Sequence, residues 1–169
     1  MVPERGVASR GGGRVRTVDT ALVRADVARC FAHGADVERW PVWLPHYRWV
    51  RFLERRGDTA GLVEMAAWRP FGPVGWPTWW VSEMTIEPEV PRVRYRHVRG
   101  ITTGMDVAWD FAPEAGGTRV TITHRWDGPA WPLIGRFAAE AVIGPVFVHG
   151  IASRTLAGIA RVAEREAGR

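Results

Sequence analysis

The stretch GPVFVHGIASRTLAGIARVAERE, residues Gly144–Glu166, predicts the helix around which the rest of the chain is arranged. On a 3.6-residue helix one face carries Val148, Ile151, Ala152, Thr155, Leu156, Ile159 and Val162. The opposite face carries Arg154, Arg161, Glu164 and Arg165. Pro145 suits the first helical turn, where a missing N–H costs nothing. An amphipathic helix of about six turns cannot bury its apolar stripe alone, so it requires a broad apolar partner.

Most of the chain before this helix predicts β-strands. The expected strands are Arg14–Thr20, Tyr47–Arg55, Gly61–Trp68, Trp79–Glu87, Arg92–Arg99, Gly104–Phe111 and Thr118–Trp126. Two short helices should separate the first two strands: Asp26 caps one that runs through Ala32, and Asp36 opens another that ends at Trp40–Pro41. Pro70–Pro77 predicts a long loop, of the kind that often forms the lip of a pocket. We expect an α+β fold in which a curved, antiparallel, seven-stranded sheet grips the C-terminal helix around an internal cavity.

The last two predicted strands have the cleanest alternation in the chain. One set of faces carries Met105, Val107, Trp109 and Phe111 with Val120, Ile122, His124 and Trp126. The other set carries Asp106, Asp110, Arg119, Thr121, Thr123 and Arg125. Both apolar rows should face the helix, so the His124 side chain should point into the interior from an aromatic row.

Length and composition predict one domain, 14–169, after a flexible tail at residues 1–13. The tail lacks the apolar run of a signal peptide. The most apolar stretch, Trp131–Ala152, contains Arg136, Glu140 and two prolines, so we expect no membrane span. The single Cys30 excludes an internal disulfide and fits a reducing cytoplasm.

The basic residues do not predict a nucleic-acid partner, although the net charge is +5. All 23 are arginines, they are scattered, and many are flanked by acids. The 10 tryptophans are more informative, since burying so many indole rings suggests aromatic walls around a ligand. The alternative is an unusually aromatic solid core.

Neither a phosphate-binding loop, a nucleophile elbow, nor a Cys/His cluster with metal-ligand spacing occurs in the sequence, so we expect no metal and no cofactor. The polar groups that could enter an apolar cavity are Tyr47, Ser82, Arg96 or His97, His124 and Thr155. Each has a structural alternative: His124 as a core imidazole, Tyr47 as a cap for the short helices, Ser82 as strand filler. Arg96 and His97 are adjacent on one strand, so only one can point inward, and the apolar row of Val93 and Tyr95 favours His97.

The chain resembles the START-like (SRPBCC) helix-grip superfamily, and within it the bacterial polyketide aromatase/cyclases. The matching blocks are Asp36-Val37-Glu38-Arg39-Trp40-Pro41 with Tyr47 following, Trp80-Val81-Ser82-Glu83, Val93–Arg96, Met105-Asp106-Val107-Ala108-Trp109 and Gly116-Gly117-Thr118. The resemblance, which runs from about Val15 to Glu166, implies a strand, two short helices, six more strands and a long helix. It also implies a cavity that folds a reactive poly-β-ketone, presented on an acyl carrier protein, for aldol ring closure and loss of water.

Carried over position by position, the resemblance places Tyr47, Ser82, Arg96 and Trp109 in the cavity, with His124 where relatives also place a polar group. It favours Arg96 over His97, which would require a bulge to shift the strand register. The sequence departs from the cyclases at Met84, where they carry an arginine two residues after the serine, and at Pro73–Pro77. Losing this cation weakens stabilisation of an enolate.

Two hypotheses follow. The first is a polyketide cyclase in which His124 is the base and Tyr47 and Arg96 are the donors to the developing oxyanion. Its expected ligand-binding wall consists of Trp40, Trp80, Ser82, Met84, Trp109, Ile122, Ile151 and Thr155. The second is a binding protein that carries a lipid, quinone or other apolar ligand, which Met84 favours.

Overall fold

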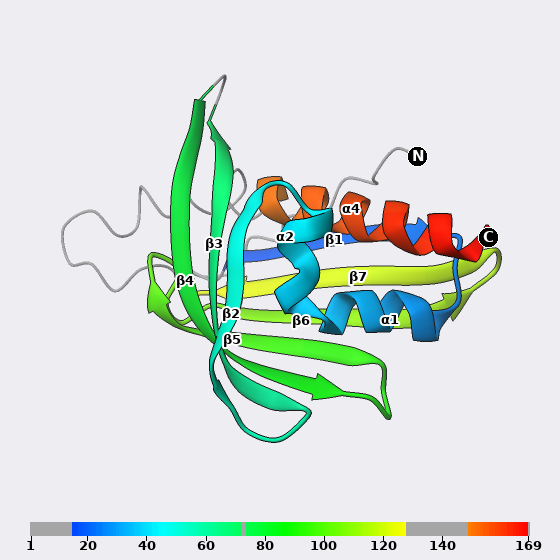
Figure 1. Cartoon of the computed structure of the whole chain (residues 1–169), viewed down its shortest axis with the longest axis horizontal. Helices are drawn as coiled ribbons and strands as arrows, with labels where there is room; N and C mark the ends of the chain where they lie inside the picture. The colour runs from blue at the N-terminus through cyan, green and yellow to red at the C-terminus, as the bar shows by residue number, and fades with distance from the viewer. Residues whose placement is uncertain (1–14, 72–73, 128–148, 169) are drawn as a thin grey trace.

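A seven-stranded antiparallel sheet dominates the computed structural model, which describes residues 15–71, 74–127 and 149–168 (Figure 1). The spatial order of its strands is β1-β7-β6-β5-β4-β3-β2. The strands are β1 (Val15–Val23), β2 (Tyr47–Arg55), β3 (Ala60–Phe71), β4 (Val74–Glu87), β5 (Arg92–Gly100), β6 (Asp106–Glu114) and β7 (Gly117–Trp126). The helices are α1 (Val27–Ala35), the 3₁₀ helix η1 (Val37–Arg39), α2 (Trp40–Trp43) and α4 (His149–Ala167). This arrangement confirms the α+β helix-grip fold.

The curvature of the sheet creates a concave face that α4 closes. Figure 1 shows β3 and β4 turned steeply against β6 and β7, with α1 and α4 running roughly along β1, β6 and β7. The predicted apolar stripe is the buried one: Ile159 is fully buried, and Thr155 and Leu156 are 1% and 2% exposed. Arg154 and Arg161 are exposed, as predicted. Pro145 and Val148 lie outside the described residues.

A glycine in α4 permits close packing against the short helices. A Cβ built on Gly158 would lie 2.0 Å from Leu44 Cδ2, at the end of α2. Leu44 is itself fully buried in the core. A larger residue at position 158 would therefore force either the Leu44 side chain or α4 to shift.

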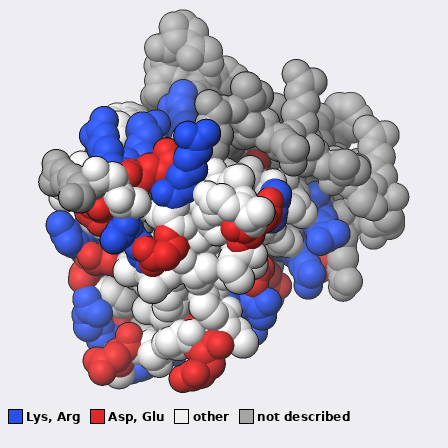
Figure 2. All heavy atoms as spheres, turned by 90° about the vertical axis from the view of Figure 1, so that its right-hand side faces the viewer, with Lys and Arg blue, Asp and Glu red and all other residues white. Residues whose placement is uncertain are grey.

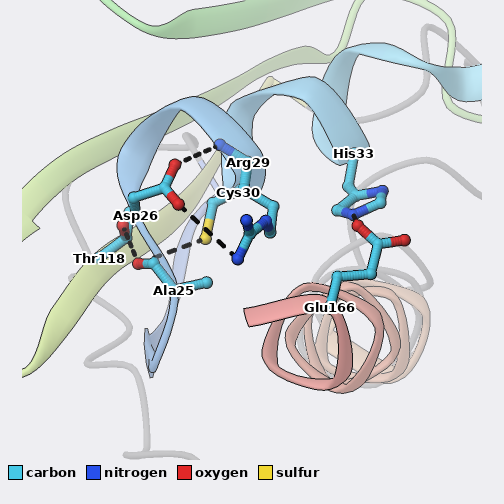
Figure 3. Close-up of polar contacts among 7 residues, drawn as sticks. All are labelled: Ala25, Asp26, Arg29, Cys30, His33, Thr118 and Glu166. Carbon is cyan, nitrogen blue, oxygen red and sulfur yellow. Dashed lines mark hydrogen bonds and ion pairs between the residues drawn. The ribbon is translucent and has the colours of Figure 1, made fainter. Parts of the chain in front are cut away.

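Helix α1 begins as the sequence predicts and is tied to the end of α4 (Figure 3). The Asp26 carboxylate accepts a hydrogen bond from the Arg29 backbone N–H at 2.8 Å, which lowers the pKa of Asp26. Further along, His33 Nε2 lies 2.9 Å from Glu166 Oε2, and the two side chains face each other between the helices. Cys30 is buried, and burial raises the pKa of its thiol. This raised pKa makes the thiol unreactive.

The second short helix is longer than predicted. The expected end at Trp40–Pro41 is wrong, because α2 begins at Trp40 and Pro41 lies in its first turn. Proline is tolerated in a first turn, where its missing N–H has no intrahelical partner. The backbone N–H of Leu44 closes the turn on Trp40 O at 2.7 Å.

The predicted long loop at Pro70–Pro77 is also wrong. Strands β3 and β4 continue as a two-stranded ribbon, with Pro70 opposite Gly75 and Phe71 opposite Val74. The neighbouring strands stop earlier, since β2 pairs only as far as Ala67 and β5 only as far as Trp80. Among the described residues, both outer edges of the ribbon therefore lack a partner strand there. Edge strands accept proline because no ladder hydrogen bond is lost.

The strands β6 and β7 have the predicted register. Trp109 and Trp126 are 4% and 2% exposed on the concave side, whereas Arg125 is exposed on the other side. On that outer face arginines pair with acids, for example Arg92 Nε with Asp110 Oδ1 at 2.5 Å. The face containing the C-terminal end of α4 likewise shows blue and red side chains interspersed (Figure 2). None of the described helices is long and apolar enough to cross a bilayer.

Candidate functional site

An internal cavity of about 70 Å³ lies between the concave face of the sheet and the first half of α4. Its lining comes from α2, the six strands β2 to β7, the loop after β5 and α4. The lining residues are Trp40, Tyr47, Met65, Trp80, Tyr95, His97, Thr102, Met105, Val107, Trp109, Ile122, His124, Ile151, Ala152 and Thr155. No charged aspartate, glutamate, lysine or arginine side chain is among these described residues.

Aromatic rings occupy much of the space that a ligand would need. The Trp40 ring lies 5.2 Å from that of Tyr47 and 5.4 Å from that of Trp109, measured between centroids. The Tyr95 ring lies 6.5 Å from Trp40. Because these rings pack on one another, the cavity is much smaller than the roughly 300–1,000 Å³ of pockets that hold drug-sized ligands. Of the four residues predicted to line one cavity, Trp80, Trp109 and Thr155 line this one, and Met84 does not.

Two histidines line the cavity from β5 and β7, the strands on either side of β6. His97 Nδ1 lies 2.6 Å from Thr102 Oγ1, and His124 Nδ1 lies 3.3 Å from Thr17 Oγ1. Burial lowers the pKa of His97 to about 4. Burial, together with the neighbouring charge of His97, lowers the pKa of His124 to about 3. Both imidazoles are therefore neutral at pH 7, and protonating one disfavours protonation of the other.

The threonine partners bear on which imidazole nitrogen faces the ligand. When Nδ1–H donates to a threonine hydroxyl, the Nε2 lone pair is left as the proton acceptor. Each histidine thus has a partner that can hold it in the tautomer a general base needs.

The hydroxyl of Tyr95 differs from the other polar groups of the cavity. Tyr95 is 6% exposed, and its oxygen has no hydrogen-bond partner among the described residues. Burial raises its pKa well above the usual value, so it remains a protonated donor. Leaving a buried hydroxyl unpaired costs about 1–3 kcal/mol, a cost that a ligand oxygen would remove.

Tyr47 has a different environment, although burial also raises its pKa. Its hydroxyl makes a hydrogen bond with Thr155, a residue of the cavity wall. The Thr155 hydroxyl donates to Ile151 O at 2.8 Å and lies 2.9 Å from His46 Nε2. Burial, then the charges of Arg154 and Arg161, lower the pKa of His46 to about 4. This network fixes the first half of α4 against the start of β2.

The structure brings together eight of the eleven predicted site residues. Trp40, Tyr47, Trp80, Trp109, Ile122, His124, Ile151 and Thr155 all line the cavity. Ser82 is fully buried in the sheet, and its hydroxyl has no partner among the described residues. Met84 is also buried, but it borders a separate hollow beside α1, η1 and Phe52.

The placement of Arg96 in the cavity is wrong. Its guanidinium lies on the outer face of the sheet, where Nη1 is 2.6 Å from Asp106 Oδ2. A register shift does occur between Val81 and Ser82 of β4, but it lies beyond His97 on the partner strand. The alternation of Val93, Tyr95 and His97 is therefore intact, and the periodicity argument for His97 was the correct one.

Sequence reasoning missed Tyr95 and Thr102 as site residues. Tyr95 was detectable, since it alternates with Val93 and His97 on the inward row of β5. Thr102 was not, because it belongs to the irregular loop between β5 and β6 and reaches the cavity only through the turn at Gly100–Gly104.

Comparison with known proteins identifies the family. A family profile described as "Polyketide cyclase / dehydrase and lipid transport" matches residues 23–146. The chain belongs to this family. It is also 30% identical to the actinorhodin polyketide synthase bifunctional cyclase/dehydratase of Streptomyces coelicolor, over 66% of this chain and 34% of that protein. The chain spans 34% and 36% of the length of the curated relatives that it matches.

Solved structures share the fold of this polyketide cyclase/dehydrase family member. The Zhui aromatase/cyclase from Streptomyces sp. R1128 superposes with a TM-score of 0.72 at 20% identity, covering 91% of this chain and 96% of that one. A START superfamily protein from Mycobacterium smegmatis superposes with a TM-score of 0.62 at 15% identity, covering 90% and 97%. These likenesses establish the START-like helix-grip architecture.

Proposed function

We propose that the chain binds a poly-β-ketone in the aromatic cavity and promotes aldol ring closure followed by loss of water. One observation carries the proposal: two neutral imidazoles and the unpartnered Tyr95 hydroxyl converge on a single aromatic cavity. Family membership supports the same class of reaction. An acyl carrier protein as the partner that presents the ketone chain is part of this proposal.

The first step requires a base and a donor. Nε2 of His97 or His124 takes a proton from a methylene between two carbonyls, and the electron pair left on carbon spreads onto the enolate oxygen. The Tyr95 hydroxyl donates a hydrogen bond to this oxygen. The enolate carbon then attacks a carbonyl carbon further along the chain, and the resulting alkoxide takes the proton back from the imidazolium. A new carbon–carbon bond has formed, and the imidazole is neutral again.

Loss of water uses the same groups in the same order. An imidazole removes a second proton from the carbon next to the new alcohol, and the hydroxyl leaves as water with that proton. Burial lowers the pKa of both imidazoles, and protonating one disfavours protonation of the other, so either of them can be the acceptor. His124, the base expected from the sequence, therefore stays a candidate beside His97.

Binding must displace part of the aromatic wall. Drug-sized ligands occupy pockets of about 300–1,000 Å³, whereas the described cavity has about 70 Å³. The rings of Trp40 and Trp109 divide the space between the short helices and β6. Rotation of either ring would join the cavity to the volume that it occupies, so ligand binding should change the environment of these two indoles.

A second candidate function is transport of an uncharged apolar ligand. The observation that favours it is the lack of any permanently charged side chain among the described cavity residues, with the apolar Met84 at the position where cyclases carry arginine. Such a cavity can hold a lipid or quinone without any chemistry.

One experiment separates the two candidates. Purified protein is mixed with a poly-β-ketone thioester, and the cyclised and dehydrated products are followed by mass spectrometry against a protein-free control. The proposal expects a rate well above the uncatalysed one. An unchanged rate, with a lipid extractable from the purified protein, would establish the carrier function and overturn the cyclase.

A further inference from the structure

A second hollow lies outside the aromatic cavity, between the outward side of α4 and the beginning of β2. It has a volume of about 430 Å³ and is lined by Pro45, His46, Trp68, Arg154, Ala157 and Arg161. Arg154 and Arg161 are two turns apart on α4, and the small side chain of Ala157 between them leaves the space open. We call this hollow the arginine groove.

The groove carries positive charge that nothing in the described structure neutralises. Arg154 and Arg161 form no ion pair within residues 15–71, 74–127 and 149–168, and neither does Arg48 at the groove's edge. Arg48 lies over the ring of Trp68 at 4.8 Å. The outer face of the sheet differs, since Arg92 and Arg96 are paired there with Asp110 and Asp106.

The positive charge of these two arginines acts on His46 at the groove floor. His46 is 8% exposed, and after burial the largest causes of its lowered pKa are the charges of Arg154 and Arg161. A site with this field stabilises an anion and disfavours a cation.

The groove and the aromatic cavity share a wall. His46 lines the groove and Thr155 lines the cavity, and these two side chains are in contact through the 2.9 Å bond from Nε2 to Oγ1. The environments that suit an anionic head and an apolar body are therefore separated by one hydrogen bond, which must open for a single ligand to occupy both.

We propose that the arginine groove binds a phosphate ester, which forms the head of the ligand whose apolar part enters the cavity. Arginine guanidinium groups match the oxygens of phosphate in pairs, and they hold their charge at every physiological pH. The Trp68 side chain, 44% exposed, supplies an apolar wall beside the head group. The inference rests on the proposed function only for the apolar part of the ligand.

The test measures binding of glycerol 3-phosphate to the full chain by calorimetry at low salt. The Arg154→Gln/Arg161→Gln double variant should bind at least about tenfold more weakly than the wild type, because two charge-assisted contacts are lost. The matched control is Arg99→Gln/Arg125→Gln, which removes the same charge from two exposed arginines on other elements, β5 and β7. The control should stay within about twofold of the wild type. Melting temperatures confirm that all variants are folded.

Two further arms identify the source of the phosphate. Binding of 4′-phosphopantetheine but not of phosphatidylglycerol vesicles would indicate the tether of an acyl carrier; the reverse would indicate a lipid head group, with phosphatidylcholine vesicles as the comparison. Equal weakening in the groove variant and the control, or no binding to the wild type, would overturn the inference.

These outcomes are separate from those of the cyclase assay. An uncharged poly-β-ketone thioester that is cyclised by a protein without phosphate affinity would overturn the groove alone. Phosphate binding that depends on Arg154 and Arg161, without turnover of the ketone, would overturn the cyclase alone.

Discussion

Replacing Tyr95 by phenylalanine should stabilise the empty protein while impairing its function. The Tyr95 hydroxyl is buried without a hydrogen-bond partner among the described residues. Removing an unsatisfied buried hydroxyl should raise the free energy of unfolding by about 1–3 kcal/mol. For a domain of this size, each kcal/mol corresponds to about 2–4 °C, so the melting temperature should rise by about 2–12 °C. If the hydroxyl donates to the enolate, turnover of a poly-β-ketone thioester should fall by about tenfold or more.

The matched variant is Tyr47→Phe, which removes the same atom from a neighbouring ring. Its hydroxyl makes a hydrogen bond with Thr155, so the change should lower stability by about 0.5–1.5 kcal/mol. The opposite signs are the diagnostic result, and differential scanning calorimetry measures both. A Tyr95→Phe protein that is less stable than the wild type would show that the hydroxyl is satisfied in solution, and the argument that it awaits a ligand would fail.

Three other predictions follow from the packing and the titrating groups. Gly158→Ala should lower the free energy of unfolding by about 1–3 kcal/mol, because its Cβ meets Leu44, and Leu44→Ala in the same chain should recover part of that loss; an additive loss in the double variant would contradict this. The free energy of unfolding should fall as the pH decreases from 6.5 toward 4, because His97 has a folded pKa of about 4 against 6.5 unfolded and the unfolded chain binds the extra proton. His97 alone should account for about 2 kcal/mol at pH 5, and urea titrations of the wild type and His97→Gln that show equal pH dependence would exclude that assignment. Finally, His97→Gln and His124→Gln should each lower the cyclisation rate, by up to about 10²–10⁴ for whichever imidazole takes the proton; unchanged rates in both folded variants would remove base catalysis by this pair.

Periodicity along single elements predicted most of the fold. The stripe of Thr155, Leu156 and Ile159 identified the helix that packs on the concave face of the sheet. The alternating rows of β6 and β7 placed the side chains of Trp109 and His124 at the interior cavity. Both patterns depend only on local geometry, with periods of 3.6 and 2 residues. Where the predictions failed, the outcome depended on neighbouring strands. Pro70 and Pro77 wrongly predicted a loop. A strand tolerates proline at an unpaired edge, and whether these edges are paired depends on where β2 and β5 stop.

The candidate site was less predictable, because burial and distance between elements determine its chemistry. Nothing local in the sequence distinguishes a His124 with a pKa near 6.5 from one with a pKa of about 3, since the shift comes from burial and from His97 on another strand. The volume of the cavity also depends on ring orientation, which brings Trp40 and Trp109 within 5.4 Å. For Arg96, resemblance to other proteins outweighed the alternation of β5, and the alternation was correct.

An NMR titration of the imidazole resonances of His97 and His124 tests the proposed chemistry most directly, when it is done with and without an unreactive enolate mimic of a poly-β-ketone. In the empty protein both imidazoles should remain neutral down to about pH 5, because burial disfavours the imidazolium. With the mimic bound, one imidazole should become protonated at a pH at least about one unit higher, since its positive charge then pairs with the enolate. Imidazole pKa values that are the same with and without the mimic, or that lie near 6.5 in the empty protein, would contradict a histidine base in this cavity.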